Sequence, residues 1–159
     1  MRSGLLLATM APYVLGTDGK CRALVLSGGS NNGAWEAGVM WGLLHYGEPA
    51  DFAWENISGV SAGAINTCYT AVWPTGQELE MTEGLSDAWA SIIAESQILV
   101  PDGWSPDQPA SIAKAVLTQN HILSSDPAVE FMGDLIAPFG EVKRRWTTAA
   151  LDWNTGEYV

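Results

Sequence analysis

Two glycine-rich stretches carry the residues whose types and spacing suit a chemical step. The first, Gly59-Val60-Ser61-Ala62-Gly63, has the pattern G-x-S-x-G. Between a strand and a helix, this pattern holds its serine in a strained turn that small neighbours tolerate, and the serine Oγ projects from the top of the sheet. Free N–H groups at the start of the next helix favour developing negative charge. The pattern predicts Ser61 as a nucleophile, with Gly59 and Gly63 as the small neighbours of this nucleophile elbow.

The other stretch contains Gly28, Gly29 and Ser30 directly after an apolar run. A glycine-rich turn can aim successive backbone N–H groups at the oxyanion of acyl transfer, so these three residues are candidates for an oxyanion hole. The same turn could instead cradle a nucleotide phosphate. A Walker loop, however, needs a Lys after Gly33, and a dinucleotide-binding loop needs a glycine where Ser30 stands. Nucleotide binding is therefore a distant alternative.

Both stretches lie where a strand is expected to lead into a helix. Residues 23–26 and 52–57 are short apolar runs typical of buried parallel strands. Apolar residues at helical spacing follow each turn. They extend to Gly47 after the turn at Gly28 and to Pro74 after the turn at Ser61. Two successive strand–turn–helix units favour an α/β fold with a parallel sheet and a ligand site at the carboxyl ends of its strands.

The rest of the chain is expected to add helices and a strand to this sheet. The patterns predict, in order, a helix over 78–95, a loop over 101–109, a short helix over 110–117, a helix that Asp126 caps, a strand over 145–153 and a returning strand from Glu157. A strand that stops after two or three residues leaves its ladder partners unmatched. We therefore expect the chain to be an incomplete part of its domain.

Composition excludes some classes of function. Lys and Arg number 7 against 18 Asp and Glu, and the net charge of -11 repels nucleic-acid backbones, so we expect no nucleic-acid partner. Hydrophobic residues make up 47% and charged residues 16% of the 159, as in a packed globular domain. Cys21 and Cys68 lack the spacing of metal ligands. We expect two buried thiols and no metal site; the alternative is a disulfide, which secretion would favour.

Residues 1–17 resemble a signal peptide, with an early positive charge, a short apolar stretch and small residues near the end. An N-terminal strand is the alternative. The apolar stretch from Leu5 to Leu15 is too short to span a membrane, and Pro12 interrupts it. A signal peptide would place the protein outside the cell or in an endomembrane lumen; otherwise we expect a cytoplasmic location.

Residues 26–39 (LSGGSNNGAWEAGV) and 57–66 (ISGVSAGAIN), together with 149–157 (AALDWNTGE), resemble the patatin-like phospholipase family. The resemblance runs over 22–159, which would be the N-terminal part of the domain. It implies an α/β three-layer sandwich with a mainly parallel central sheet, similar to the α/β hydrolases and incomplete at its C-terminus. It also implies a Ser-Asp dyad that hydrolyses acyl esters of lipids, without metal or organic cofactor. If the lipid substrate is part of a membrane, the resemblance implies that the reaction takes place at the membrane surface.

The family's motifs assign roles to particular residues. Ser61 matches the nucleophile, and Gly28, Gly29 and Ser30 match the oxyanion loop. The chain departs from the pattern at Ser30, where the family usually has a third glycine, and at Asn32, where it usually has Arg or Lys. These departures favour an alternative, a catalytically inactive lipid- or protein-binding relative.

The resemblance places the general base in a D-G-[GA] motif beyond residue 153, and we expect that aspartate to be missing from this chain. Asp102 and Asp152 are expected in turns, and His45 and His121 as exposed or capping side chains. The alternative is a Ser-Asp-His triad in which His45 or His121 is the base. Since serine is a poor nucleophile without a base, we expect the 159 residues alone to hydrolyse esters very slowly or not at all. Lys143-Arg144-Arg145 is expected to be the solvated start of a strand.

Overall fold

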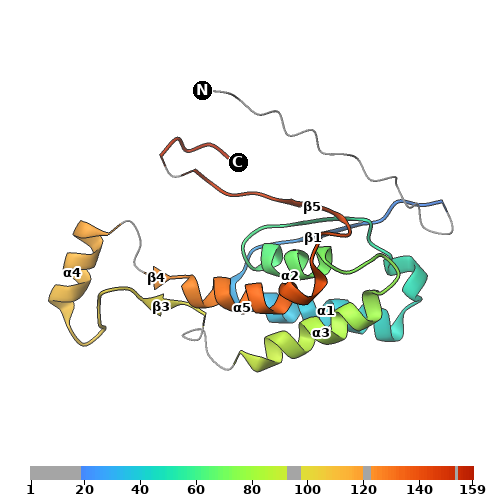
Figure 1. The fold of residues 1–159 in the computed structure, drawn as a ribbon, viewed down its shortest axis with the longest axis horizontal. Coiled ribbons are helices and arrows are strands. Elements are labelled where there is room, and N and C mark those ends of the chain that lie inside the picture. Colours follow the sequence, from blue (N-terminus) through green and yellow to red (C-terminus); the bar gives the residue numbers. More distant parts are fainter. Residues whose placement is uncertain (1–18, 93–97, 120–122, 153) are drawn as a thin grey trace.

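A three-stranded parallel sheet lies against one side of the packed helices (Figure 1). The computed structural model describes residues 19–92, 98–119, 123–152 and 154–159. The strands β1 (Ala23–Leu26), β2 (Asn56–Gly59) and β5 (Arg145–Thr148) lie side by side in the order β1-β2-β5 (Figure 1). The expected α/β class and mainly parallel sheet are confirmed, for a part of the domain. The predicted signal peptide lies outside the described residues and stays a prediction.

Helices connect the strands and pack on the sheet. The helices are α1 (Gly33–Tyr46), α2 (Ala62–Ala71), α3 (Glu78–Ser91), α4 (Pro109–Thr118) and α5 (Asp126–Ile136), with the 3-10 turns η1 (Ser30–Asn32), η2 (Pro49–Phe52) and η4 (Ala137–Phe139). A short antiparallel pair, β3 (Val100–Pro101) and β4 (Leu123–Ser124), flanks α4. In Figure 1, α2 lies under the sheet with α5 beside it, and α1 and α3 pack on each other beyond α2.

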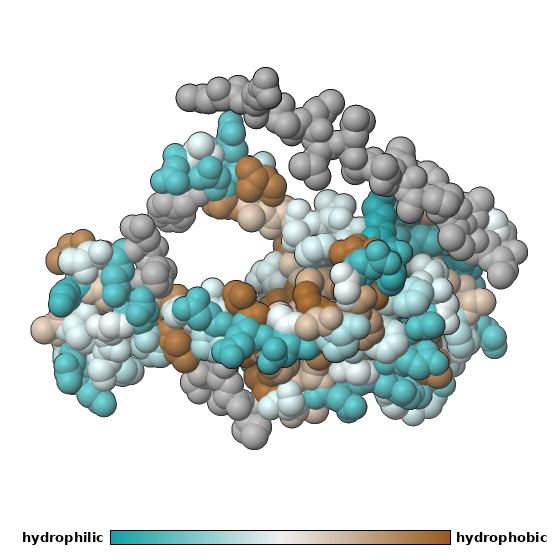
Figure 2. All heavy atoms as spheres, in the orientation of Figure 1, coloured by the Kyte–Doolittle hydropathy of each residue, from teal (hydrophilic) through white to brown (hydrophobic). Residues whose placement is uncertain are grey.

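The core lies between the sheet and these helices. Its buried apolar side chains come from α1 (Ala37, Met40, Leu44), from the sheet and the turn before it (Trp54, Ile57), from α2 (Tyr69, Ala71) and from α3 (Met81, Leu85). Burying one such large side chain stabilises the fold by about 1.5–3 kcal/mol. Val25, in contrast, is 75% exposed on β1. Hydrophobic side chains are also visible at the surface over the helices in Figure 2.

Several boundaries differ from the sequence-based prediction for local reasons. The second strand begins at Asn56 instead of residue 52, because Pro49–Phe52 forms a 3-10 turn. Ser125 occupies the N-cap position of α5, and Asp126 is its first helical residue, so the predicted cap is one residue too late. Within the described residues, no helix is long and apolar enough to cross a membrane.

The two cysteines are free thiols, but they are not both buried as predicted. Cys68 is half-buried in α2. Cys21 is exposed, because it lies just before the first strand, where its Sγ is 2.9 Å from Asn56 Nδ2. The prediction of burial was therefore wrong for Cys21.

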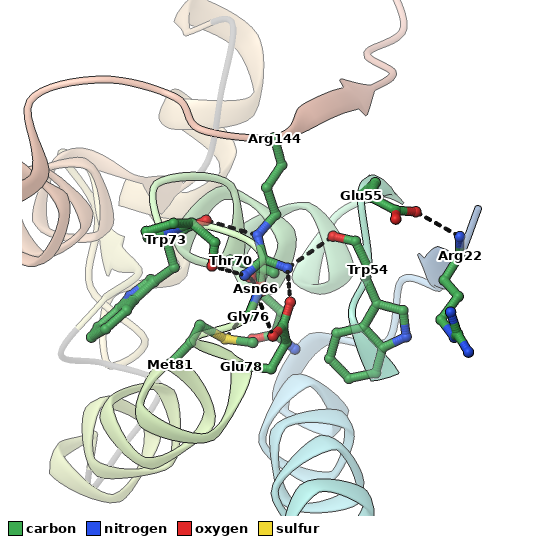
Figure 3. Close-up of polar contacts among 11 residues, drawn as sticks. Arg22, Trp54, Glu55, Asn66, Thr70, Trp73, Gly76, Glu78, Met81 and Arg144 are labelled. Carbon is green, nitrogen blue, oxygen red and sulfur yellow. Dashed lines mark hydrogen bonds and ion pairs between the residues drawn. The ribbon is translucent and has the colours of Figure 1, made fainter. Parts of the chain in front are cut away.

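Arg144, just before β5, is buried instead of solvated, which corrects the prediction for the run 143–145. Its guanidinium binds the Glu78 carboxylate at 2.7 Å and donates to the carbonyl oxygens of Trp54, Trp73 and Pro74, each at 2.8 Å (Figure 3). Burial lowers the pKa of this guanidinium, whereas the charge of Glu78 and its hydrogen bond raise it. The side chain thus ties the amino end of the sheet to the start of α3.

Candidate active site

Ser61 lies in the turn between β2 and α2, where its backbone adopts φ 53° and ψ −121°. A positive φ is unfavourable for a residue with a side chain, and such strain costs about 1–3 kcal/mol. Among the described residues, Ser30 and Ser61 are the non-glycine residues with positive φ. The Ser61 side chain is exposed at the carboxyl end of β2 and at the start of α2. This is the geometry expected of a nucleophile elbow.

Close packing explains the two glycines on either side of Ser61. A Cβ on Gly59 would lie 2.2 Å from the carbonyl oxygen of Gly63 and 2.7 Å from Thr67 Oγ1. On Gly63, it would lie 2.6 Å from the Leu26 carbonyl oxygen and 2.7 Å from that of Ser27. The Gly63 N–H also donates to the Ser27 carbonyl at 3.1 Å. The missing side chains therefore let α2 begin directly against the end of β1.

The structure brings the turn at Gly28 and Gly29 next to the turn that holds Ser61. Leu26 pairs with Gly59 in the parallel ladder, so the turns that follow β1 and β2 share one edge of the sheet. A Cβ on Gly28 would lie 3.1 Å from Ser61 Cβ and 3.7 Å from Ser61 Oγ. In the described part of the chain, the backbone N–H groups of Gly28 and Gly29 donate no hydrogen bond. Gly28 therefore packs against the Ser61 side chain, and the N–H groups of Gly28 and Gly29 in this turn are available as donors.

Ser30 and Asn32, where the chain departs from the resembled pattern, form the 3-10 turn η1 that leads into α1. Ser30 has φ 52°, a value at which a third glycine would be relaxed. The Asn32 N–H donates to the Gly29 carbonyl at 2.9 Å, and Asn32 Cβ would lie 3.1 Å from a Cβ on Gly29. The uncharged Asn32 thus packs against the turn, and no cation stands at that position.

A hydrogen-bond network joins the glycine turn to the helix that follows Ser61. Glu36 on α1 accepts the Ser27 N–H with Oε1 at 3.1 Å and Asn66 Nδ2 with Oε2 at 3.0 Å. Asn66 Nδ2 also donates to the Gly33 carbonyl at 2.9 Å, and its Oδ1 accepts Trp89 Nε1 at 2.7 Å. α1, α2 and α3 therefore meet through one buried amide.

Comparison with known families identifies the family to which the chain belongs. The profile of the family described as patatin-like phospholipase matches residues 24–151, which is most of the chain. The chain belongs to the patatin-like phospholipase family. Searches of curated proteins and of solved structures gave no significant match. At the level of the family, membership supports a lipid acyl hydrolase function with a lipid as the substrate.

The acidic residues that the sequence singled out in this patatin-like chain lie in turns. Asp102 lies in a bend and precedes Gly103, which has φ 68°. The Asp152 carboxylate accepts the backbone N–H groups of Asn154 at 2.8 Å and Thr155 at 3.4 Å. Asp152 therefore orders its own turn, as the sequence predicts. Within the described residues, no group of three or more His, Cys, Asp or Glu side chains could hold a metal ion.

The described histidine and the half-buried thiol are engaged elsewhere in the patatin-like fold. His45 stacks on Trp41 at 3.8 Å, its Nδ1 lies 2.8 Å from the Trp41 carbonyl oxygen, and its Nε2 lies 3.5 Å from the Glu83 carboxylate. His121 lies outside the described residues. Burial raises the pKa of the Cys68 thiol, so less of it is thiolate at neutral pH. Ser61 is the stronger candidate nucleophile.

A small apolar pocket lies between α2, α3 and α5, and its volume of about 20 Å³ is close to that needed for one water molecule. Ile65 lines it, four residues beyond Ser61 and hence about one helical turn away. Its other walls are Leu85, Ala88, Trp89, Ile92, Ile98, Ala128, Phe131, Met132 and Leu135. Trp89 also lies against the start of α1, since a Cβ on Gly33 would be 2.5 Å from its ring. The pocket of this patatin-like chain therefore starts close to the serine turn.

Three residues of the network, Glu36, Asn66 and Trp89, were not expected from the sequence as parts of the site. Glu36 and Asn66 stand inside the two motifs, but glycine and serine positions dominate those patterns. Asn66 gave one usable signal, because it falls on the helix face that also carries Ala62 and Tyr69, and a polar residue on a buried face needs partners. The partner positions themselves depend on the fold.

Proposed function

We propose that the chain carries the nucleophile and oxyanion hole of a serine hydrolase that cleaves acyl esters of lipids. Ser61 is the nucleophile in the elbow that Gly59 and Gly63 permit, and the backbone N–H groups of Gly28, Gly29 and Ser30 form the oxyanion hole. The observation that carries the proposal is the positive φ of Ser61, with Gly28 packed against the same side chain.

In the proposed reaction, Ser61 Oγ attacks the ester carbonyl carbon while its proton passes to a general base. The carbonyl oxygen becomes an oxyanion that the backbone N–H groups stabilise, and removing one such donor typically slows a hydrolase by about 100- to 1000-fold. The intermediate collapses, and the alcohol leaves with the proton. Water then attacks the acyl-serine in the same way, releases the fatty acid and restores the hydroxyl.

We assign the general base to an aspartate that completes a Ser-Asp dyad and that is not among these 159 residues. Its expected D-G-[GA] sequence does not occur here, since the Asp-Gly pairs at Asp18 and Asp102 are followed by Lys20 and Trp104. Without that carboxylate, the rate of proton removal from Ser61 falls by several orders of magnitude. The chain alone is therefore expected to turn over esters very slowly or not at all.

The apolar lining of the pocket favours an acyl chain, rather than a polar group, as the part of the substrate that lies next to it. Its lining consists of apolar side chains, and burying each methylene of an acyl chain contributes about 0.8 kcal/mol. A lipid in a membrane surface is our proposed source of that chain. The net charge of -11 favours a surface that is not strongly anionic.

Covalent labelling with a fluorophosphonate probe tests the proposal. We expect the probe to label Ser61 in a longer form that contains the dyad aspartate, and very slowly or not at all in the chain alone. Ser61→Ala should abolish labelling without lowering the melting temperature, whereas the matched control Ser91→Ala, an exposed serine at the end of α3, should label normally. A folded longer form that contains the dyad aspartate and binds lipid vesicles, but never labels at Ser61, would contradict hydrolysis and support the inactive lipid-binding alternative.

A further inference from the structure

We propose that Glu36 is a positioning residue of the proposed active site. Its carboxylate holds the glycine turn that carries the oxyanion donors against α2, the helix that follows Ser61. The inference rests on the proposed function. It explains how the turn at Gly28 and the turn at Ser61, which are distant in sequence, keep a fixed position relative to each other. Glu36 lies on α1, between these turns in the chain.

The two oxygens of the Glu36 carboxylate serve different elements. Oε1 accepts the Ser27 N–H at 3.1 Å and lies 3.5 Å from Ser27 Oγ, whereas Oε2 accepts Asn66 Nδ2 at 3.0 Å. One side chain therefore bridges the residue before Gly28 and a residue five positions after Ser61. Hydrogen bonds to a charged acceptor are stronger than those between neutral groups. In the described residues, this half-buried carboxylate forms no ion pair that would give it another role.

Asn66 cannot turn away from Glu36, because its other polar contacts fix the amide. The side chain is fully buried. Its Nδ2 donates a second hydrogen bond to the Gly33 carbonyl at 2.9 Å, and its Oδ1 accepts Trp89 Nε1 at 2.7 Å. Both donors and the acceptor of the amide are thus in use. Oε2 of Glu36 is consequently anchored to a rigid point of α2.

Ser27 is held from both sides, and this sets the direction of the following peptide groups. Its N–H points to Glu36, and its carbonyl accepts the Gly63 N–H at 3.1 Å. Gly28 comes next, with its Cα close enough to Ser61 that a Cβ would be 3.1 Å from the serine Cβ. A glycine turn has little conformational restriction of its own. Without Glu36, the Ser27 N–H loses its partner and the donors of Gly28 and Gly29 are free to reorient.

Two substitutions of Glu36 separate positioning from a general loss of structure. Glu36→Ala removes both hydrogen bonds. Glu36→Gln keeps the shape but offers one oxygen and one NH2 group, so it can accept from Ser27 or from Asn66 and presents a donor to the other. The conservative variant should therefore restore part of what alanine loses. Glu130→Ala, an exposed glutamate on α5, is the matched control.

The experiment measures the rate of fluorophosphonate labelling of Ser61, as a function of probe concentration, in the longer form that contains the dyad aspartate. We expect Glu36→Ala to lower the maximal labelling rate by about 10- to 100-fold, since small displacements of catalytic geometry have effects of this size. The probe concentration at half-maximal rate should not change, because the probe's binding surface is intact. Glu36→Gln should lose about 3- to 10-fold, and Glu130→Ala should match the wild type.

The outcomes distinguish this inference from the proposed function. Equal labelling rates in the wild type and in a folded Glu36→Ala contradict the positioning role alone. If Glu36→Ala does not fold, Glu36→Gln decides, and a wild-type rate in that variant also contradicts the role. Absence of labelling in the folded wild-type form that contains the dyad aspartate contradicts the proposed function, and the positioning role with it.

Discussion

The two ends of the parallel sheet differ in backbone strain and in hydrogen bonding. At the carboxyl ends of β1 and β2, the turns contain two serines with positive φ, and the Ser61 side chain is exposed. At the amino end of β5, the Arg144 side chain is fully buried, with an acceptor for each of its three nitrogens. Strain and free donors are gathered at one end, and saturated hydrogen bonds at the other.

The difference indicates how the fold supports a strained site. A backbone in an unfavourable conformation persists only where its surroundings hold it there. Arg144 links the residues before β2 and β5 to Glu78 at the start of α3, and α3 in turn packs on α1. The amino end thus fixes the strands and helices whose other ends carry the two turns. Substitutions at the two ends should therefore separate stability from reactivity.

The largest effect should come from Arg144→Met at the buried end. Removing one partner of a buried ion pair costs about 3–5 kcal/mol of unfolding free energy, because the charge of Glu78 remains without compensation. Three carbonyl oxygens would also lose their donor. Urea unfolding followed by tryptophan fluorescence measures this change. Labelling of Ser61 in the fraction that stays folded should keep its wild-type rate.

Lys143→Met is the matched control, because Lys143 pairs with the exposed Glu141 and such surface pairs contribute about 0–1 kcal/mol. The double variant Glu78→Leu/Arg144→Met should remain less stable than the wild type, since the carbonyl oxygens of Trp54, Trp73 and Pro74 would still be unpaired. Wild-type stability of Arg144→Met would refute the assignment of a stabilising role to this end.

A smaller effect, and one on reactivity as well, is expected from Gly63→Ala at the other end. The new methyl would lie 2.6 Å from the Leu26 carbonyl oxygen and must push α2 away from β1. A displacement of about 1 Å can lower a rate by about 100-fold. We expect the labelling rate of Ser61 to fall by that order, and stability to fall with it.

Gly38→Ala and Gly42→Ala are controls for the glycine substitution. Both positions are in α1, and an added Cβ meets nothing within 4 Å. Alanine in a helix should stabilise the chain by up to about 1 kcal/mol without changing the labelling rate. If Gly63→Ala behaved like these two, the close approach of α2 to β1 would not matter for the site.

The sequence predicted the turn at the carboxyl end of the sheet but not the buried Arg144 at the amino end. The turn at the carboxyl end can be recognised from a short stretch of sequence, because glycines that admit a positive φ or a close contact stand in a fixed pattern around Ser61. β1 and the start of α3 were located to the residue. Arg144 was misjudged, since its partners lie 66 to 90 residues earlier in the chain. No local pattern encodes such a long-range contact.

The same reason accounts for the missed network at the site. Glu36 and Ser27 are nine residues apart, but Asn66 is 30 residues from Glu36 and 23 from Trp89. Their meeting depends on how α1, α2 and α3 cross, and periodicity alone does not determine that crossing. Cys21 shows the converse case, in which an apolar residue type was expected inside but its place before β1 leaves it exposed.

The smallest effect is expected from Ser30→Gly, which makes the turn more like the family's pattern. Glycine removes the penalty of φ 52°, about 1–2 kcal/mol, but adds flexibility to the unfolded chain, so the net gain in unfolding free energy should be at most about 1 kcal/mol. The proposed oxyanion donor at this position is the backbone N–H, which glycine retains. The labelling rate of Ser61 should therefore change by less than about 3-fold. Ser30→Val, with a branched side chain that tolerates positive φ poorly, should be destabilised in thermal unfolding. A tenfold loss of labelling in Ser30→Gly would show that the hydroxyl, and not the peptide N–H, is what this position contributes, and the strained end would then depend on side chains as the buried end does.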